Sequence, residues 1–482
     1  MRFQEVSIRK ISENMWEIPQ TGGMRVPGLV FASEAMMGEI VRDEAVRQVM
    51  NVAHLPGILR HSIGMPDIHW GYGFPIGGVA AMDPDEGVVS PGGVGYDINC
   101  GVRLLRTDLT ASSLKPRLPE LLAALHRDTP SGVGSTGSVH LSPKDEEKVL
   151  VDGSRWAASA GFGSGDDVEF TESGGKYPGA DPDAVSAVAK KRGRDQLGTL
   201  GSGNHFLEID EVAEIFDEKA AESYGLFHGQ AVVQIHSGSR GLGYQVCDDY
   251  LSDMADYMRR NRIELPDRQL ACAHIRSPEG ERYLAALAAA ANFAFANRQL
   301  LAHQARETFL KALKMGPREL GMRLVYDCGH NNAKFEQHEV DGRSRKVLVH
   351  RKGATRSFPA GSPEIPEKYR HVGQPVLIPG DMGNASYVLA GEPGAMRLSF
   401  GSTCHGAGRR MSRTQAKASV RGRSIAQDMA KRGVLVACAS WKTLGEEIPE
   451  AYKDVTAVVN VVHDAGIARK VARLKPVAVV KG

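Results

Sequence analysis

The sequence has no excess of charge of either sign and no long apolar run. Its 482 residues include 59 Lys and Arg against 57 Asp and Glu, a formal charge of +2, so a polyanion could bind only at a local patch. No run approaches the roughly 18 apolar residues of a membrane helix. Residues 1–18 lack the apolar stretch of a signal peptide. We therefore expect a cytoplasmic protein with no membrane partner.

Cysteine is scarce and scattered along the chain. The six cysteines form no CxxC pair, which argues against a zinc ribbon and a disulfide framework. The chain also has no Pro/Ser/Gly linker, low-complexity tract or fixed-period repeat. The length alone suggests about three domains of ~150 residues each, but no boundary supports that division. We predict a single catalytic domain over residues 1–482.

Strand-like and helical patterns both occur, and they do not alternate one for one. Apolar β-favouring runs at residues 101–107, 231–236 and 475–481 predict strands, and residues 118–128 predict a helix. The Ala-rich run 281–313 predicts one long helix, which we interpret as a packing element. These patterns favour an α+β fold with mixed β-sheets around a central metal site and helices at the periphery.

Five strand-like runs each end at a glycine-rich turn that presents a candidate metal ligand. The candidates are Asp97 and Cys100 in GVGYDINCG, His205 in LGSGNHFLEI, His236 in VVQIHSGSRG, His330 in RLVYDCGHNN and His405 in FGSTCHGAGR. Loops at the ends of rigid elements often carry chemistry, so five such turns predict one convergent site. Ligands this far apart in sequence require the segments to fold back on one another.

The residue types at these turns point to a metal-assisted reaction. Asp97 and Cys100 lie three residues apart, so both can face one ion, and a thiolate can bridge to a second. Taken alone, Cys100 or His236 is more often a buried structural residue than a ligand. Their joint occurrence at Gly-flanked strand ends favours a site. By ligand type alone, thiolate with imidazole favours zinc.

His405 differs from the other candidates in the residues on its C-terminal side. Two glycines without a Cβ let a phosphate approach the backbone, and three arginines supply positive charge. These residues are Gly406, Gly408, Arg409, Arg410 and Arg413. The pattern suits a histidine that attacks phosphorus better than one that holds a metal. Earlier in the chain, Asp67 in MPDIHWGYGFP is either a polar contact in a cleft or a structural carboxylate.

Eight ordered motifs together resemble the RtcB family of RNA ligases, which splice tRNA and repair broken RNA. The motifs are YDINCGVR, GSGNHFLEI, VQIHSGSRGLG, YDCGHNNAK, VHRKGATRSFPAG, PVLIPGDMGNASYVL, CHGAGR and a final VVKG. They span nearly the whole chain. The resemblance implies GTP- and Mn²⁺-dependent joining of an RNA 3′-phosphate or 2′,3′-cyclic phosphate end to a 5′-hydroxyl end. It also implies RNA as a partner and archease as an accessory factor.

The resemblance assigns roles to the candidate ligands. It implies that His405 takes GMP as a phosphoramidate and passes it to the RNA 3′-phosphate, where the 5′-hydroxyl then displaces it. Around a Cys100 bridging two Mn²⁺ ions, it implies His205 and His236 at one ion, and Asp97 and His330 at the other. Manganese in place of zinc follows from the resemblance and not from ligand softness.

The resemblance also implies a guanine-nucleotide pocket. A carboxylate such as Glu208 can accept from the N1–H and N2–H₂ edge of guanine, which adenine lacks. The implied GTP-binding residues are Asn204, Glu208, His330, Asn331, Ser386, His405, Gly406, Ala407, Gly408, Tyr452 and Lys481. Asp381 in IPGDMGN departs from the family pattern, in which serine is expected, and is left out of this set.

Contacts to RNA are expected at a few residues beside the site motifs. The resemblance implies Asp67 near the RNA end, and Arg240, Lys352 and Arg413 along the RNA backbone. Lysine and arginine on a surface are also commonly just solvated. Two other classes stay open: a two-metal phosphodiesterase that does not use His405, and a non-catalytic RNA-binding protein on the same fold. The complete ligand set and the intact CHGAGR argue against both.

Overall fold

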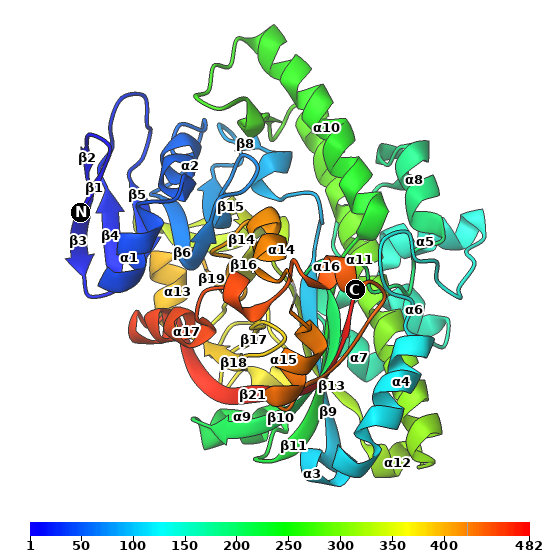
Figure 1. Ribbon diagram of the computed structural model, residues 1–482. Helices are drawn as coiled ribbons and strands as arrows, with labels where there is room; N and C mark the ends of the chain where they lie inside the picture. The colour runs from blue at the N-terminus through cyan, green and yellow to red at the C-terminus, as the bar shows by residue number, and fades with distance from the viewer. Residues whose placement is uncertain (422) are drawn as a thin grey trace.

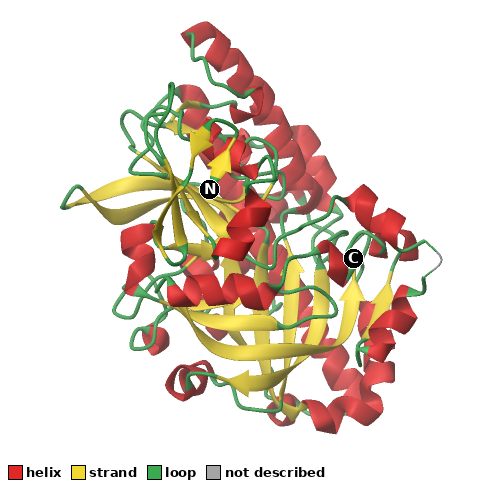
Figure 2. Cartoon of the chain, turned by 60° about the vertical axis from the view of Figure 1, so that its left-hand side comes forward, coloured by secondary structure: helices red, strands yellow, loops and turns green. Residues whose placement is uncertain are grey.

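The computed structural model describes residues 1–421 and 423–482 and contains two large β-sheets (Figures 1 and 2). The central sheet has the strand order β13-β9-β11-β10-β21-β18-β17, with β20 paired to β21. Its strands are β9 (Gly101–Thr110), β10 (Phe206–Ile215), β11 (Gln230–Ser237), β13 (Arg323–Gly329), β17 (Pro375–Ile378), β18 (Ser386–Gly391), β20 (Leu435–Cys438) and β21 (Ala468–Lys481).

The second large sheet has the order β14-β15-β7-β6-β5-β4-β3. Its strands are β3 (Arg9–Ser12), β4 (Met15–Ile18), β5 (Gly28–Phe31), β6 (Ser62–His69), β7 (Ile76–Met82), β14 (Asn331–Val340) and β15 (Arg343–Lys352). Three short pairs complete the strands: β1 (Arg2–Phe3) with β2 (Val6–Ser7), β8 (Val88–Val89) with β12 (Ala273–His274), and β16 (Ala354–Arg356) with β19 (Ser402–Cys404). Parallel pairs β5–β6 and β20–β21 among antiparallel ones make both sheets mixed.

Two long helices, α10 (Arg240–Asn261) and α11 (Pro278–Leu313), run beside the sheets (Figure 1). The shorter helices are α1 (Glu34–Ile40), α2 (Ala45–Val52), α3 (Ala111–Leu114), α4 (Leu118–Asp128), α5 (Pro143–Asp152), α6 (Ser154–Ser159), α7 (Gly165–Glu169), α8 (Ala187–Arg194), α9 (Glu218–Tyr224), α12 (Pro317–Leu320), α13 (Pro393–Leu398), α14 (Arg413–Ser419), α15 (Ile425–Lys431), α16 (Trp441–Leu444) and α17 (Val455–Asp464). In the described ranges, no helix is both long and apolar enough to cross a membrane.

Hydrophobic side chains pack against both faces of the central sheet. Leu301 and Phe309 of α11 pack with Val233 of β11 on one face, together with side chains of α4. On the other face, Tyr224 of α9 packs against Val232. Burying both faces explains why the strands read as continuous apolar runs in the sequence.

The predicted elements are present, and the α+β class with mixed sheets is confirmed. The helix predicted at 118–128 has those bounds as α4. The long Ala-rich helix begins three residues earlier than predicted. Ser277 accepts a hydrogen bond from the amide of Gly280, and Pro278 occupies the first turn, so the start is capped. The strand predicted at 475–481 is the second half of β21.

Candidate active site

The strand register of the central sheet brings the candidate ligands to one edge. His236 lies opposite Phe206 on β10 and Val102 on β9. Gly101 lies opposite both Ser237 and Gly329. Because Cys100, His205 and His330 directly adjoin these paired residues, all of them lie near His236 at the same sheet edge. The second sheet begins there, since β14 starts immediately after His330.

Five of the candidate ligands form two groups that share one thiol. Cys100, His236 and His330 form one group, and Asp97, Cys100 and His205 form the other. The Cys100 Sγ lies 3.3 Å from the Nε2 of both His205 and His236. The Nε2 of His205 lies 2.9 Å from the Asp97 carboxylate. A shared thiol between two groups is the arrangement that a bridging thiolate requires.

The structure groups the candidate ligands differently from the pairing implied by the resemblance. His205 groups with Asp97 and not with His236, and His236 groups with His330, whose Nε2 lies 3.3 Å from its own. The reason is backbone geometry. Leu200 O accepts from His205 Nδ1 at 2.8 Å, which turns the other ring nitrogen toward Asp97.

The pKa shifts of the side chains in the cluster favour protonation states that can bind a divalent cation. Burial, reinforced by the neighbouring histidines, lowers the pKa of His236 and His330 well below the usual value, so both rings are neutral ligands at pH 7. Burial opposes ionisation of Asp97, but its hydrogen bond and attraction to His205 prevail and lower its pKa to about 2. Burial and the Asp97 charge raise the pKa of Cys100, an effect that a bound cation reverses. Neutral imidazoles, a carboxylate and a thiol therefore fit a transition-metal site.

His405 is held by a carboxylate from a distant strand. Asp67, on β6, accepts from the backbone N–H of His405 at 3.0 Å and from its Nδ1 at 2.6 Å. It also accepts from the amide of Gly406 at 3.3 Å. Asp67 is fully buried, but the charge and hydrogen bonds of His405 outweigh burial and lower its pKa. With Nδ1 engaged, the Nε2 of His405 is the nitrogen left for chemistry.

The backbone after His405 passes close to Asp67. Gly408 has φ +74°, and a Cβ there would lie 2.2 Å from the Asp67 carbonyl oxygen. The glycine is therefore needed for this contact. His405 also faces the metal cluster, because its ring centroid lies 4.8 Å from that of His330.

A cavity of about 490 Å³ joins the cluster, His405 and most of the predicted nucleotide residues. Predicted residues that line it are Asn204, Glu208, His330, Asn331, His405, Gly406, Ala407, Gly408, Tyr452 and Lys481. Ser386 is not among the lining residues. It is buried, and its Oγ accepts from the amide of Gly380, which does line the cavity.

Glu208, which lines the cavity, pairs with a second acid, Asp210. Burial and the charge of Asp210 raise the pKa of Glu208 well above its usual range, and burial raises that of Asp210 to about 6. Gln234 Nε2 donates to Asp210 at 2.7 Å. Lys481, opposite Phe206 on the paired strand β21, supplies a nearby positive charge. Burial and the charge of Asp210 therefore disfavour the ionised form of Glu208 before any ligand donates to it.

Several cavity residues were missed by the sequence analysis. Asp381 lines the cavity although it was left out of the nucleotide set. Glu447 also lines it; it accepts from the Tyr452 hydroxyl and lies 3.2 Å from Arg409. Tyr72 and Tyr96 form another part of the wall. Glu447 follows no glycine-rich strand end, so nothing in its neighbourhood marked it.

The four residues predicted near RNA occupy different settings. Arg413 is exposed at the start of α14 and lines the cavity. Lys352 lines it too, but its Nζ donates to the carbonyls of Tyr72 and Gly92, and burial lowers its pKa to about 7. Arg240 lines an adjoining groove of about 370 Å³. Asp67 is buried against His405, away from the surface.

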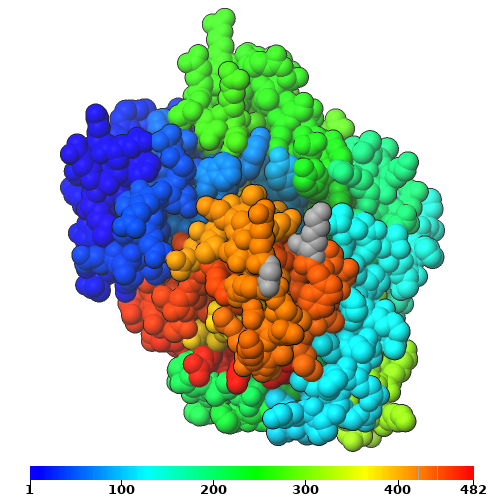
Figure 3. All heavy atoms as spheres, in the orientation of Figure 1, coloured from blue at the N-terminus to red at the C-terminus, as the bar shows by residue number. Residues whose placement is uncertain are grey.

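The segment on the C-terminal side of His405 lies at the surface of the molecule. In Figure 3 the orange segment, which includes α14 and α15, lies across the middle of the visible face between the blue N-terminal part and the cyan and green helices. Arg410 N donates to Ala451 O, and Lys453 N donates to Gly408 O, so the two ends of this segment are held together.

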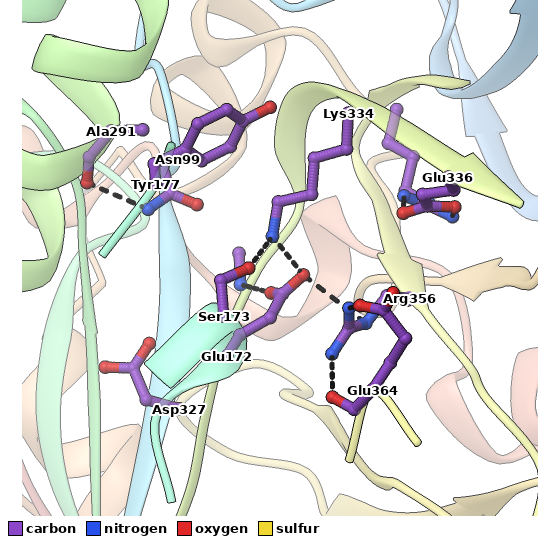
Figure 4. A network of polar contacts seen from close by, with 12 residues as sticks. Asn99, Glu172, Ser173, Tyr177, Ala291, Asp327, Lys334, Glu336, Arg356 and Glu364 are labelled. Carbon is purple, nitrogen blue, oxygen red and sulfur yellow. Dashed lines mark hydrogen bonds and ion pairs between the residues drawn. The ribbon is translucent and has the colours of Figure 1, made fainter. Parts of the chain in front are cut away.

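Behind the cluster lies a buried network of charges, shown in Figure 4. Glu172 accepts from the Gly329 amide at 2.9 Å and from Lys334 Nζ at 2.6 Å, and Arg356 lies 3.5 Å away. These cations outweigh burial and lower the pKa of Glu172 to about 2. Because Gly329 directly precedes His330, the network fixes the backbone that carries this ligand.

A shared-thiol cluster of potential metal ligands and a carboxylate-held histidine line one cavity, an arrangement that fits a metal-binding protein with a candidate nucleophile. The profile of one family, described as tRNA-splicing ligase RtcB, matches residues 48–482. The tRNA-splicing ligase RtcB of Thermococcus kodakarensis is 53% identical over 478 residues, covering 99% of each chain. Those of Archaeoglobus fulgidus and Aeropyrum pernix are each 52% identical, covering 98% of this chain and 99% of theirs. This chain belongs to the RtcB family.

Proposed function

We propose that this protein is a GTP- and Mn²⁺-dependent RNA ligase. It joins an RNA 3′-phosphate or 2′,3′-cyclic phosphate end to a 5′-hydroxyl end, in tRNA splicing or RNA repair. The observation that carries the proposal is the placement of His405, oriented by Asp67 and facing the Cys100 cluster across one cavity. The relatives named as tRNA-splicing ligases support the substrate class.

The proposed first step is attack by His405 on GTP. The Nε2 lone pair forms a bond to the α-phosphorus, the bond from that phosphorus to the bridging oxygen breaks, and pyrophosphate leaves. Asp67 stabilises the positive charge that develops on the imidazole, because it accepts from Nδ1 at 2.6 Å. The RNA 3′-phosphate oxygen then displaces His405 from the GMP phosphorus. In the last step the 5′-hydroxyl attacks the RNA phosphorus, and GMP leaves.

Asp97, Cys100, His205, His236 and His330 are the residues that would hold two Mn²⁺ ions. The chemistry that such ions supply is neutralisation of phosphate oxygens and of the leaving pyrophosphate. Cys100 belongs to both groups of ligands, which supports a bridging role. The neutral state of His236 and His330 leaves their ring nitrogens free to ligate.

The nucleotide pocket is proposed to select guanine. Glu208 and Lys481 line the same cavity as His405 and its glycines. The N1–H and N2–H₂ of guanine can donate to an ionised Glu208. Tyr452 and Asn204 complete the proposed nucleotide contacts, and Ser386 acts through Gly380.

The RNA ends are proposed to enter over positive charge at the rim of the cavity. Arg413 is exposed there, and Arg240 with Arg192 lines the groove that meets the cavity at Tyr96 and Asp97. Phosphate contacts of this kind position a strand without reading its sequence. Archease, implied by the family resemblance, is the proposed accessory partner.

One labelling experiment tests the proposed function against the alternatives. The purified protein is incubated with α-³²P-labelled GTP and Mn²⁺ and then run on a denaturing gel. We expect an acid-labile label on the protein, which passes to RNA when a 3′-phosphate end is added. A phosphodiesterase or a non-catalytic RNA-binding protein would carry no label, and that result would overturn the proposal.

A further inference from the structure

The long helix α11 carries polar side chains in its most deeply buried part. Asn292, Asn297, Arg298 and Gln299 are all fully buried, between alanines whose small side chains let neighbouring segments approach. Burying amides and a guanidinium is costly unless every donor and acceptor is paired. The helix was expected to be a packing element, so these four side chains require a separate explanation.

Asn297 joins two segments that lead to proposed metal ligands. Its Oδ1 accepts from the amides of Gly198 and Thr199 at 2.7 and 3.1 Å. Its Nδ2 donates to Thr199 O, Ser237 Oγ and Gly238 O, each at 3.1 Å. Leu200, the next residue, provides the carbonyl that orients His205. Asn297 therefore fixes the segment that turns His205 and the strand end that follows His236.

Arg298 joins two backbone carbonyls and one carboxylate beside the site. Its Nη1 donates to Asn99 O at 2.7 Å and to Ser237 O at 3.0 Å. Its Nε and Nη2 bond to Asp327 at 2.8 to 3.1 Å. Asn99 precedes Cys100, Ser237 follows His236, and Asp327 is three residues before His330. Asn99 itself has φ +53°, and its side-chain amide donates to Ala291 O of the same helix.

We infer that Asn297 and Arg298 are positioning residues for the metal site. Two consecutive residues of one rigid helix are hydrogen-bonded to all four segments that supply the five proposed ligands. Arginine has no acceptor and faces backbone carbonyls, so it acts on the ligands and not on the ion. Hydrogen bonds to the residues around metal ligands set the orientation of those ligands, and their loss typically lowers metal affinity about 10- to 100-fold. The inference rests on the proposed function, which supplies the metal.

The same helix offers a matched control. Asn292 is also fully buried; its Nδ2 donates to the carbonyls of Leu150, Val151 and Tyr177, and its Oδ1 accepts from the Tyr177 amide. These partners belong to α5 and the segment near Tyr177, outside the ligand segments. Asn292→Ala therefore removes a comparable set of hydrogen bonds from the same helix without releasing a ligand.

Manganese titration of the full-length protein tests the inference. Chelator-stripped wild type, Asn297→Ala, Asn292→Ala and Arg298→Lys are titrated with Mn²⁺, and free ion is measured by electron paramagnetic resonance. We expect both asparagine variants to lower the Tm. We expect Asn297→Ala to bind manganese about 10- to 100-fold more weakly and Asn292→Ala to stay within threefold of wild type. Arg298→Lys should also bind more weakly, because one ammonium cannot replace the planar fork that serves two carbonyls and a carboxylate.

The outcomes separate this inference from the proposed function. Equal affinities for Asn297→Ala and Asn292→Ala overturn the inference and leave the ligase proposal standing. If Asn297→Ala does not fold, the manganese affinity of Arg298→Lys tests the inference instead. A wild-type affinity in Arg298→Lys would also overturn the inference. A wild-type protein that binds no manganese overturns the proposed function and the inference together.

Discussion

At the residue scale, substitution of His405 and substitution of the proposed metal ligands should have different effects on guanylylation and on metal binding. His405→Ala should abolish the covalent guanylylated protein, because no other group in the site replaces the attacking nitrogen. Both manganese ions should remain, since His405 belongs to neither ligand group. Labelling with α-³²P-GTP and metal counting on the same preparation check this. Loss of the ions from the variant would show that His405 is a ligand and not the nucleophile.

The thiol and the carboxylate of the cluster should also be distinguishable. Cys100 lies in both ligand groups, whereas Asp97 lies in one. Cys100→Ala should therefore remove both ions, and Asp97→Ala should mainly weaken one. Metal content of the two purified variants is the measurement. Loss of one ion from each variant would contradict a bridging thiolate.

Asp67 should act through His405 and not through RNA. Asp67→Asn keeps a hydrogen-bond acceptor but removes the negative charge beside the Nδ1 of His405. The first-order rate of guanylylation at saturating GTP should fall about 10²- to 10⁴-fold, the range of a lost acid–base partner. The Kd for a 3′-phosphate RNA should stay within threefold. Weaker RNA binding at an unchanged guanylylation rate would contradict this prediction and support the contact between Asp67 and RNA that the sequence analysis expected.

At the element scale, local patterns predicted the strand ends but not the contacts that cross between them. Apolar runs beside glycine-rich turns located β9, β10, β11 and β13 correctly, because their residues are buried on both sheet faces. The glycine-rich turn precedes β9 and β10 and follows β11 and β13. The strand β6 was not predicted, since a Gly and a Pro interrupt the apolar residues of SIGMPDIH. Asp67 lies on β6, so its pairing with a histidine 338 residues away was out of reach of any local pattern.

The pairing of β10 with β21 brings the proposed guanine contacts together, and it carries a pH prediction. Burial and the charge of Asp210 raise the pKa of Glu208 in the free protein, whereas the N–H groups of guanine favour its ionised form. GTP binding should therefore release a proton, and the KM for GTP should fall as pH rises through the Glu208 pKa. ATP, which lacks this edge, should show no such fall.

Glu208→Gln provides the control, because glutamine cannot ionise. Its KM for GTP should be nearly independent of pH between 6 and 9, and the GTP:ATP ratio of guanylylation rates should narrow. Each unpaired hydrogen-bonding group costs about 1–3 kcal/mol, which corresponds to roughly 5- to 150-fold in that ratio. An unchanged ratio with a slower rate would place base recognition elsewhere in the cavity, with Asp381 or Glu447 the next acids to test.

At the scale of the whole molecule, one site draws on segments from Asp67, which holds His405, to Lys481, which lines the cavity, so the fold and the site depend on each other. The motifs identified the candidate ligands that the structure brings together, because each lies on a conspicuous strand end. They could not identify Asn297 or Arg298, whose alanine-rich surroundings read as packing, or Glu447, which has no motif around it. Their roles depend on contacts between segments as much as 199 residues apart. The single domain predicted over residues 1–482 stays a prediction.

This mutual dependence predicts that manganese stabilises the folded protein. The ligand segments are far apart in the unfolded chain, so an ion binds the native state preferentially and raises its stability by about 2.7 kcal/mol per site at 100 times the Kd. Thermal unfolding should occur at a Tm several degrees higher with excess Mn²⁺ than with chelator, a shift that Cys100→Ala should abolish and His405→Ala should retain. Mg²⁺, which prefers oxygen ligands, should shift the Tm less. An equal shift in Cys100→Ala would mean that the stabilising ions bind outside the Cys100 cluster.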